Sequence, residues 1–145
     1  MSLTVKGQVD YWLKISAESM LDMRAAFRSG RRTNALFCGH LAIEKMLKAL
    51  CSARRVPSNQ IWGHNLIQLT QKAGLVLTSV QVMELGTITS FNLTTRYDDH
   101  KRQFAQICSK QYAGHWISII ENWYTDLKQT VMHERASLPN KTAAV

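Results

Sequence analysis

The chain has 145 residues, of which 46% are apolar and 19% are charged, and its formal net charge is +8. This length suits one domain with its own core, and the apolar fraction is too high for a mainly disordered chain. Two prolines and seven glycines are few for a β-sandwich or a proline-rich scaffold. The positive charge indicates an anionic partner, such as a nucleotide, a nucleic acid, an acidic protein or a membrane surface, or else a basic surface without a partner.

The three cysteines, Cys38, Cys51 and Cys108, are widely spaced and form no C-x-x-C pair. Such a pattern predicts reduced, mostly buried thiols in the cytoplasm rather than a disulfide framework or a zinc site. The five histidines are scattered without metal-ligand spacing, so neither a metal nor another cofactor is expected. No apolar segment typical of a signal peptide opens the chain, and no run of about 18 apolar residues predicts a membrane span.

Two long helices are predicted first. Apolar side chains recur at helical spacing over residues 4–28, and Gly30 follows as the stop. The second helix begins at Thr33 or Asn34 and ends near Arg55. It carries two apolar stripes, one of large residues (Leu36, Ile43, Leu47, Leu50) and one of small residues (Ala35, Cys38, Ala42, Ala49, Ala53). A helix that is apolar on two sides is expected at the centre of a bundle.

Shorter elements follow a break at Val56-Pro57. A helix is predicted over residues 64–73, with Leu66, Leu69 and Ala73 facing inward and Gly74 as its stop. Thr78 and Gln81 then form a capping-box pattern that opens another helix. The residues expected on its inner face are Val80, Met83, Thr87 and Phe91.

The polar stretch 94–101 predicts a turn, and the last helix is predicted over residues 103–132. Gly114 lies inside that helix as a weak point or a close-packing point. No strand pattern competes anywhere. The predicted fold is therefore all-α, an up-and-down bundle of four to five helices over residues 1–132, with a flexible tail over 133–145.

Common enzyme signatures, including phosphate-binding glycine loops, nucleophile elbows and H-E-x-x-H, are absent from the sequence. Three polar constellations remain as candidates. In the first, Glu44, Lys45 and Lys48 interrupt an otherwise apolar helix. They form either a surface ion pair of small energy or a charged patch that faces a groove or a partner subunit.

The second constellation runs from Arg96 to Arg102 and includes Tyr97, Asp98 and His100. Arginine offers paired donors to phosphate, histidine exchanges protons near neutrality, and tyrosine can stack on a base. This inventory suits nucleotide or RNA binding, or metal-independent RNA cleavage. The alternative is a solvated helix end in which the acids pair with Arg and Lys.

The third constellation is His64-Asn65-Leu66, where a histidine at a helix start is either a cap, a donor at the core edge or part of a site. Taken in order, these pieces resemble the HEPN family (higher eukaryotes and prokaryotes nucleotide-binding domain). The most specific part of the resemblance is the string A-x-E-K-x-L-K-A-L from Ala42 to Leu50. His64-Asn65-Leu66 and Thr95-Arg96-Tyr97-Asp98 follow at the expected places, so the resemblance covers nearly all of residues 5–132.

The resemblance implies a small helical bundle that forms a homodimer with a polar cleft between its subunits. It also implies a partner, a minimal nucleotidyltransferase, in a toxin–antitoxin-type pair, and some members are thought to be RNases. In the family's RNase motif an Arg is followed by a His after four to six residues, whereas three residues separate Arg96 from His100 here. The chain looks more like the subgroup whose motif is R-Y-P, with Asp98 in the place of Pro.

Three hypotheses follow from the sequence. The first is a binding module in which Arg96, Tyr97, Asp98, Lys45 and Lys48 contact a nucleotide phosphate or a protein partner, with Glu44 and His64 orienting the cleft. The second is a metal-independent endoribonuclease in which His100 is the acid or base and Arg96 stabilises the phosphorane. The third is a dimerisation scaffold without a ligand.

Overall fold

The structure is a computed structural model that describes residues 3–140. Over these residues the chain forms helices and turns and no strand, which confirms the predicted all-α class with one helix more than the expected four to five. The elements are α1 (Val5–Arg28), α2 (Arg32–Ala53), η1 (Ser58–Gln60), α3 (Leu66–Ala73), α4 (Ser79–Thr89), η2 (Leu93–Thr95), α5 (Asp98–Ile107) and α6 (Lys110–Ala136).

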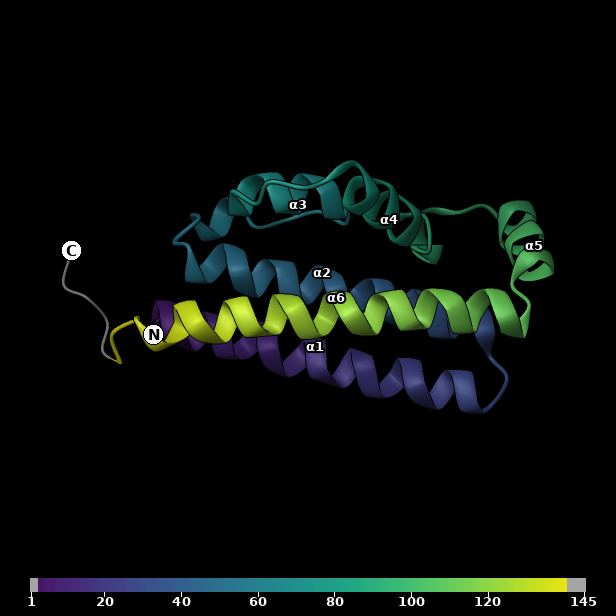
Figure 1. Cartoon of the computed structure of the whole chain (residues 1–145), viewed down its shortest axis with the longest axis horizontal. Coiled ribbons are helices and arrows are strands. Elements are labelled where there is room, and N and C mark those ends of the chain that lie inside the picture. Colours follow the sequence, from purple (N-terminus) through teal and green to yellow (C-terminus); the bar gives the residue numbers. More distant parts are fainter. Residues whose placement is uncertain (1–2, 141–145) are drawn as a thin grey trace.

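The three long helices, α1, α2 and α6, lie lengthwise beside one another, and the shorter α3 and α4 run along the other side of α2 (Figure 1). Helix α5 stands at one end of the bundle, between α4 and the start of α6. Helix α2 contacts every other α-helix, including both neighbours in sequence and α6 from the far end of the chain. The central position that its two apolar stripes predicted is therefore confirmed.

Burial explains why α2 is central. The large-residue stripe of α2 has no exposed surface at any of its four positions, and neither do Ala35, Ala42 and Ala49 of the small-residue stripe. Gly39 lies between them and allows α1 and α6 to approach the α2 backbone. A Cβ atom at Gly39 would lie 2.7 Å from Cδ1 of Ile120 and 2.9 Å from Sδ of Met23. The close-packing glycine is thus Gly39, while a Cβ at Gly114 would make only an ordinary contact of 3.7 Å with Phe27.

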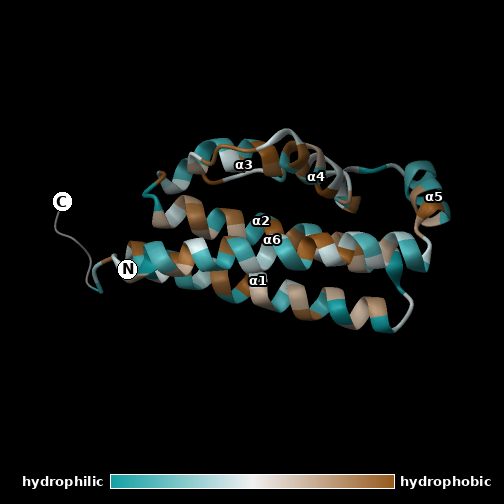
Figure 2. Cartoon of the chain, viewed as in Figure 1, coloured by the Kyte–Doolittle hydropathy of each residue, from teal (hydrophilic) through white to brown (hydrophobic). Residues whose placement is uncertain are grey.

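The inward face expected for α4 is wrong at two positions. Val80 and Met83 are 57% and 64% exposed, and the helix buries Leu85 and Ile88 instead. The sequence of α4 is apolar on most sides, as the hydrophobic colours around much of the helix show (Figure 2). Because no polar face marks the outside, spacing alone could not select the face that packs against α3 and α2.

The last predicted helix, over 103–132, is in fact two helices. Helix α5 ends at Ile107, and Ser109 caps α6 by accepting a hydrogen bond of 3.0 Å from the backbone N–H of Tyr112. The stretch predicted as a polar turn supplies the first turn of α5, where Asp98 and Asp99 lie near the positive end of the helix dipole.

Helix α6 continues past the expected end at Met132 and ends at Ala136. Glu134 pairs with Arg54 at the end of α2, Arg135 pairs with Asp10 of α1, and Leu138 packs against the core. Residues 141–145 of the predicted tail lie outside the described residues. Within residues 3–140 none of the helices is long and apolar enough to span a membrane.

Candidate functional site

Polar side chains follow one ridge of α2 through the core. His40, Glu44, Lys48 and Ser52 recur at every fourth position, which places them one above another on the helix, and all four are buried. Polar groups are seldom buried without partners, because desolvation costs energy that only hydrogen bonds or ion pairs return. The contacts of this ridge therefore identify the first candidate site.

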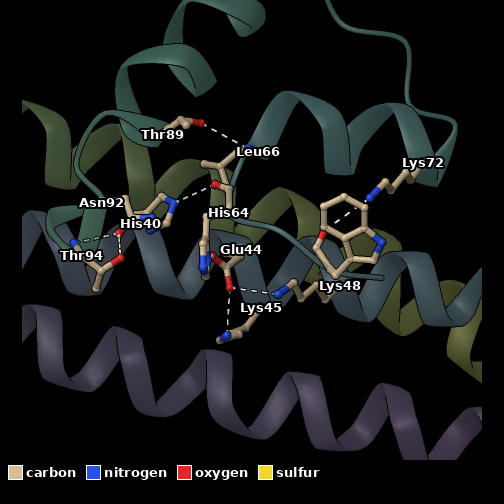
Figure 3. Close-up of polar contacts among 11 residues, drawn as sticks. His40, Glu44, Lys45, Lys48, His64, Leu66, Lys72, Thr89, Asn92 and Thr94 are labelled. Atoms are coloured by element: carbon tan, nitrogen blue, oxygen red, sulfur yellow. Dashed lines mark hydrogen bonds and ion pairs between the residues drawn. The ribbon is translucent and has the colours of Figure 1, made fainter. Parts of the chain in front are cut away.

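The Glu44 carboxylate is the centre of these contacts (Figure 3). Its Oε2 accepts hydrogen bonds of 2.9 Å from Nζ of Lys45 and 3.1 Å from Nζ of Lys48. Its Oε1 accepts one of 2.6 Å from Nδ1 of His64, which precedes α3. The side chain of Glu44 has no exposed surface. The Glu44 carboxylate is thus buried and paired within the chain, so it does not form the surface ion pair of the first alternative.

This pairing determines the protonation of Glu44. Burial by itself would raise the pKa of the carboxyl, but the hydrogen bonds from Lys45 and His64 and the charges of Lys45 and Lys48 outweigh it. The result is a pKa of about 2, compared with an ordinary value of 4.5. Glu44 is therefore a carboxylate at every pH near neutrality and acts only as an acceptor.

His40 and Asn65 fix the backbone around His64. Nε2 of His40 donates a hydrogen bond of 3.1 Å to the backbone carbonyl of His64. Asn65, the next residue, caps α3 by accepting from the N–H groups of Ile67 and Gln68. The cap is therefore Asn65, and the His64 side chain is free to reach Glu44. Burial lowers the pKa of His40, so this inner histidine is neutral.

The aromatic ring of Trp12 completes this group from α1. Nζ of Lys45 lies 5.6 Å from the ring centroid, and Nζ of Lys48 lies 5.4 Å from it. A cation near an aromatic face is stabilised by the ring's quadrupole, particularly where water is excluded. We call Glu44, Lys45, Lys48 and His64 the Glu44 cluster.

The second candidate site is a cavity of about 350 Å³ beside α5. Arg96 and His100 both line it, together with Gln103 on the same helix and Tyr112 at the start of α6. We call it the Arg96 pocket. It brings the arginine and the histidine of the second constellation to one surface, and the residues that line it include no carboxylate.

Arg96 is held in place within this pocket. Its guanidinium carbon lies 5.1 Å above the ring centroid of Phe104, and Nη2 donates to the backbone carbonyl of Ser90. Phe104 is itself buried against Phe91, with ring centroids 5.6 Å apart. The guanidinium has five N–H donors, so one bond to Ser90 leaves others for a ligand.

Tyr97 and Asp98 lie next to the pocket and do not line it. Tyr97 is 80% exposed, and its ring lies edge-on to His100 at a centroid distance of 6.3 Å. Asp98 and Asp99 are exposed in the first turn of α5. They therefore lie at a solvated helix end, as one alternative expected, but neither acid forms an ion pair with Arg or Lys among the described residues.

Within one chain, the candidate residues of the first hypothesis fall into two groups, the Glu44 cluster and the residues at the Arg96 pocket. Over residues 3–140, no hydrogen bond, ion pair or cavity joins the Glu44 cluster to the Arg96 pocket. Sequence reasoning also missed His40, whose role was signalled by its position four residues before Glu44. It missed Gln103 and Tyr112 as well, because only the break between α5 and α6 brings Tyr112 to the pocket.

The remaining candidate ligands and nucleophiles, the histidines, acids and cysteines, form no further site in residues 3–140. Residues 3–140 contain no group of three His, Cys, Asp or Glu side chains that could hold one metal ion. All three cysteines are free, and Cys51 and Cys108 are buried as expected, while Cys38 is half-buried. Burial raises the pKa of each thiol, that of Cys51 to about 11, which favours the protonated form near neutral pH.

Of the comparisons with known proteins, only the one with family models gives a match. No curated protein and no solved structure matches the chain significantly. The family model of the HEPN domain matches residues 9–130, from the second turn of α1 to near the end of α6. This span includes both candidate sites and every helix that builds them. The chain therefore belongs to the HEPN domain family, and its bundle is a helical module of the nucleotide-binding or RNase type.

Proposed function

We propose that this HEPN domain binds a phosphate-bearing ligand, specifically a nucleotide, in the Arg96 pocket. One observation carries the proposal: Arg96 and His100 line a single cavity of about 350 Å³ that no carboxylate lines. Ligand pockets in proteins are of this order of size, with a few polar groups in fixed places.

The pocket has suitable groups for both parts of a nucleotide. Arg96 is held between Phe104 and the Ser90 carbonyl, so a phosphate meets a guanidinium already oriented and the entropic cost of binding is small. Tyr97, exposed beside His100, offers a ring on which a base can stack. No residue of the Glu44 cluster lines this pocket.

Calorimetry with a panel of nucleotides tests the proposal. Arg96→Ala is expected to weaken binding by tenfold or more, since a charge-assisted hydrogen bond contributes about 1.5–3 kcal/mol. The matched control is Arg102→Ala, which removes the same charge from an exposed position of α5 outside the pocket. Equal affinities of the two variants would remove Arg96 from the site.

Metal-independent RNA cleavage is the second candidate, because His100 and Arg96 share the pocket. His100 would exchange the proton, and Arg96 would stabilise the charge on the phosphorane. Incubation of the chain with RNA in the presence of a chelator tests this activity. Cleavage that is lost in His100→Ala and kept in His115→Ala supports it, and intact RNA with the wild-type chain contradicts it.

For partners, we propose a homodimer that works with a minimal nucleotidyltransferase in a toxin–antitoxin-type pair in the cytoplasm. The family supports this proposal, since HEPN domains often dimerise, and the protonated, free thiols suit a reducing compartment. Sedimentation should give about twice 16.5 kDa. Co-purification with a nucleotidyltransferase encoded beside this chain tests the proposed pair. A dimer that binds neither a ligand nor a protein partner would favour the scaffold hypothesis instead.

A further inference from the structure

His64 is held from three directions, although its side chain is exposed. Its backbone carbonyl accepts a hydrogen bond from His40. Two residues further on, the backbone N–H of Leu66 donates a hydrogen bond of 3.2 Å to Oγ1 of Thr89. Its Nδ1 lies 2.6 Å from Glu44. A surface side chain ordinarily loses rotamer freedom only at a cost. The contact with Glu44 orients the imidazole, and the other two hold the backbone on either side of it.

The contact with Glu44 also determines which ring nitrogen faces outward. Because a carboxylate only accepts, Nδ1 of His64 carries the proton in their hydrogen bond. In the neutral ring Nε2 then holds the lone pair. The side chain of His64 is 56% exposed, and none of the described residues hydrogen-bonds Nε2. The outer nitrogen of His64 therefore faces solvent, while the inner one is held by the buried carboxylate.

The cluster also carries one positive charge in excess. Lys45 and Lys48 share a single oxygen of Glu44, so one carboxylate compensates two ammonium groups. Lys48 is nearly buried, whereas the Lys45 side chain is 24% exposed. The free N–H groups of Lys45 are therefore the donors that a molecule from solvent can reach. His64 and Lys45 bond the two oxygens of the same carboxylate, so they lie close together around Glu44 (Figure 3).

We propose that His64 and Lys45 form a second anion site that binds the phosphate group of a small phosphate ester, separate from the Arg96 pocket. Nζ of Lys45 donates to one phosphate oxygen. Nε2 of His64 accepts from a protonated phosphate oxygen, or donates to the dianion once the imidazole is protonated. Glu44 and His40 are positioning residues, since they act on the ligand through His64. The site does not depend on the function proposed for the Arg96 pocket.

Nitrogen-15 NMR of the histidine side chains tests the site directly. Before ligand is added, His64 should show a protonated Nδ1 and an Nε2 with a free lone pair. Inorganic phosphate and adenosine monophosphate should then move the Nε2 signal of His64, whereas adenosine should leave it unchanged. A phosphate-free nucleoside that moves the signal as far as the nucleotide would overturn the proposal.

Variants separate this site from the Arg96 pocket. Lys45→Gln and His64→Gln should each weaken the binding of inorganic phosphate about tenfold, the loss expected for one hydrogen bond to a charged group. The glutamine at position 64 can still donate to Glu44 but cannot exchange a proton, and Lys45 is exposed enough to be replaced without unfolding. Arg96→Ala and the exposed control His115→Gln should leave the His64 response intact. Wild-type affinity in both cluster variants, or a response that disappears in Arg96→Ala, would show that the site does not exist.

Discussion

The carboxylate of Glu44 is buried, and Lys48 beside it is nearly as well shielded from solvent. Removal of one partner from a buried ion pair leaves the other charge without compensation, which costs about 3–5 kcal/mol. We therefore expect Glu44→Gln to lower the free energy of unfolding by about 3 kcal/mol. Chemical denaturation measures this change.

The matched control is Glu121→Gln, whose ion pair with Arg24 lies at the surface, with side chains 36% and 41% exposed. Exposed pairs contribute about 1 kcal/mol or less. Equal losses in the two variants would contradict the central role of burial in the Glu44 cluster.

The depressed pKa of Glu44 predicts a loss of stability in acid. The pKa is about 2 in the folded chain and near 4.5 in the unfolded chain, so the unfolded state takes up its proton first as the pH falls. The stabilisation is complete above the unfolded pKa and is lost as the pH falls toward 2. It amounts to about 3 kcal/mol, at 1.36 kcal/mol for each pH unit of difference.

Denaturation curves at about pH 5 and about pH 2.5 test this prediction, because the other carboxyl groups are common to the wild type and Glu44→Gln. The wild type should lose more stability between these two conditions than the variant. The same loss in both would assign acid sensitivity to other groups, such as Asp10, whose pKa is lowered by its hydrogen bond from Arg135.

Among the helices, α2 depends on close contact with α1 and α6 at Gly39. A methyl group there would collide with Ile120 and Met23, both without exposed surface, so their side chains have little room to move. Gly39→Ala should destabilise the fold by about 1–3 kcal/mol, the usual cost of overpacking. Thermal unfolding measures the loss.

Gly86 of α4 is the matched control for Gly39, since its added Cβ would find its nearest neighbour, Cδ1 of Ile67, at 3.9 Å. Gly86→Ala should stabilise the helix by about 0.5–1 kcal/mol through its higher helix propensity. If Gly39→Ala were as stable as Gly86→Ala, the helices would be free to separate and the packing argument would fail.

At the scale of the whole molecule, the C-terminal end of α6 contacts both α1 and the end of α2. Arg54 and Asp10 pair with Glu134 and Arg135, and Leu138 adds apolar contact. A chain that ends at Met132 should therefore unfold about 1–3 kcal/mol more easily, since it loses two ion pairs and buried area. Denaturation of the shortened chain measures this loss.

The comparison variant for this truncation is Arg135→Ala, which removes a single exposed pair and should cost about 1 kcal/mol or less. Unchanged stability in the shortened chain would mean that residues beyond 132 contribute nothing to the bundle. That outcome would favour the boundary that the sequence predicts at residue 132.

The sequence by itself determined the features that depend on neighbours along the chain. The stripes of α2, the Asn65 and Thr78 positions at helix starts, and the stop at Gly74 follow from spacing and local hydrogen bonding. The resemblance to the HEPN family also rests on such local sequence patterns. They failed in α4, where Val80 and Met83 were placed inside, because a helix that is apolar on most sides has no preferred face.

The tertiary structure alone decided which polar residues come into contact. Glu44 and His64 are twenty positions apart, and their 2.6 Å contact exists because the loop before α3 folds back onto α2. Tyr112 joins Arg96 because the chain turns between α5 and α6. Spacing along a helix predicts which residues share a face, but not what that face meets. Within one chain, the packing places the Glu44 cluster on central α2 and the Arg96 pocket beside α5 at one end of the bundle.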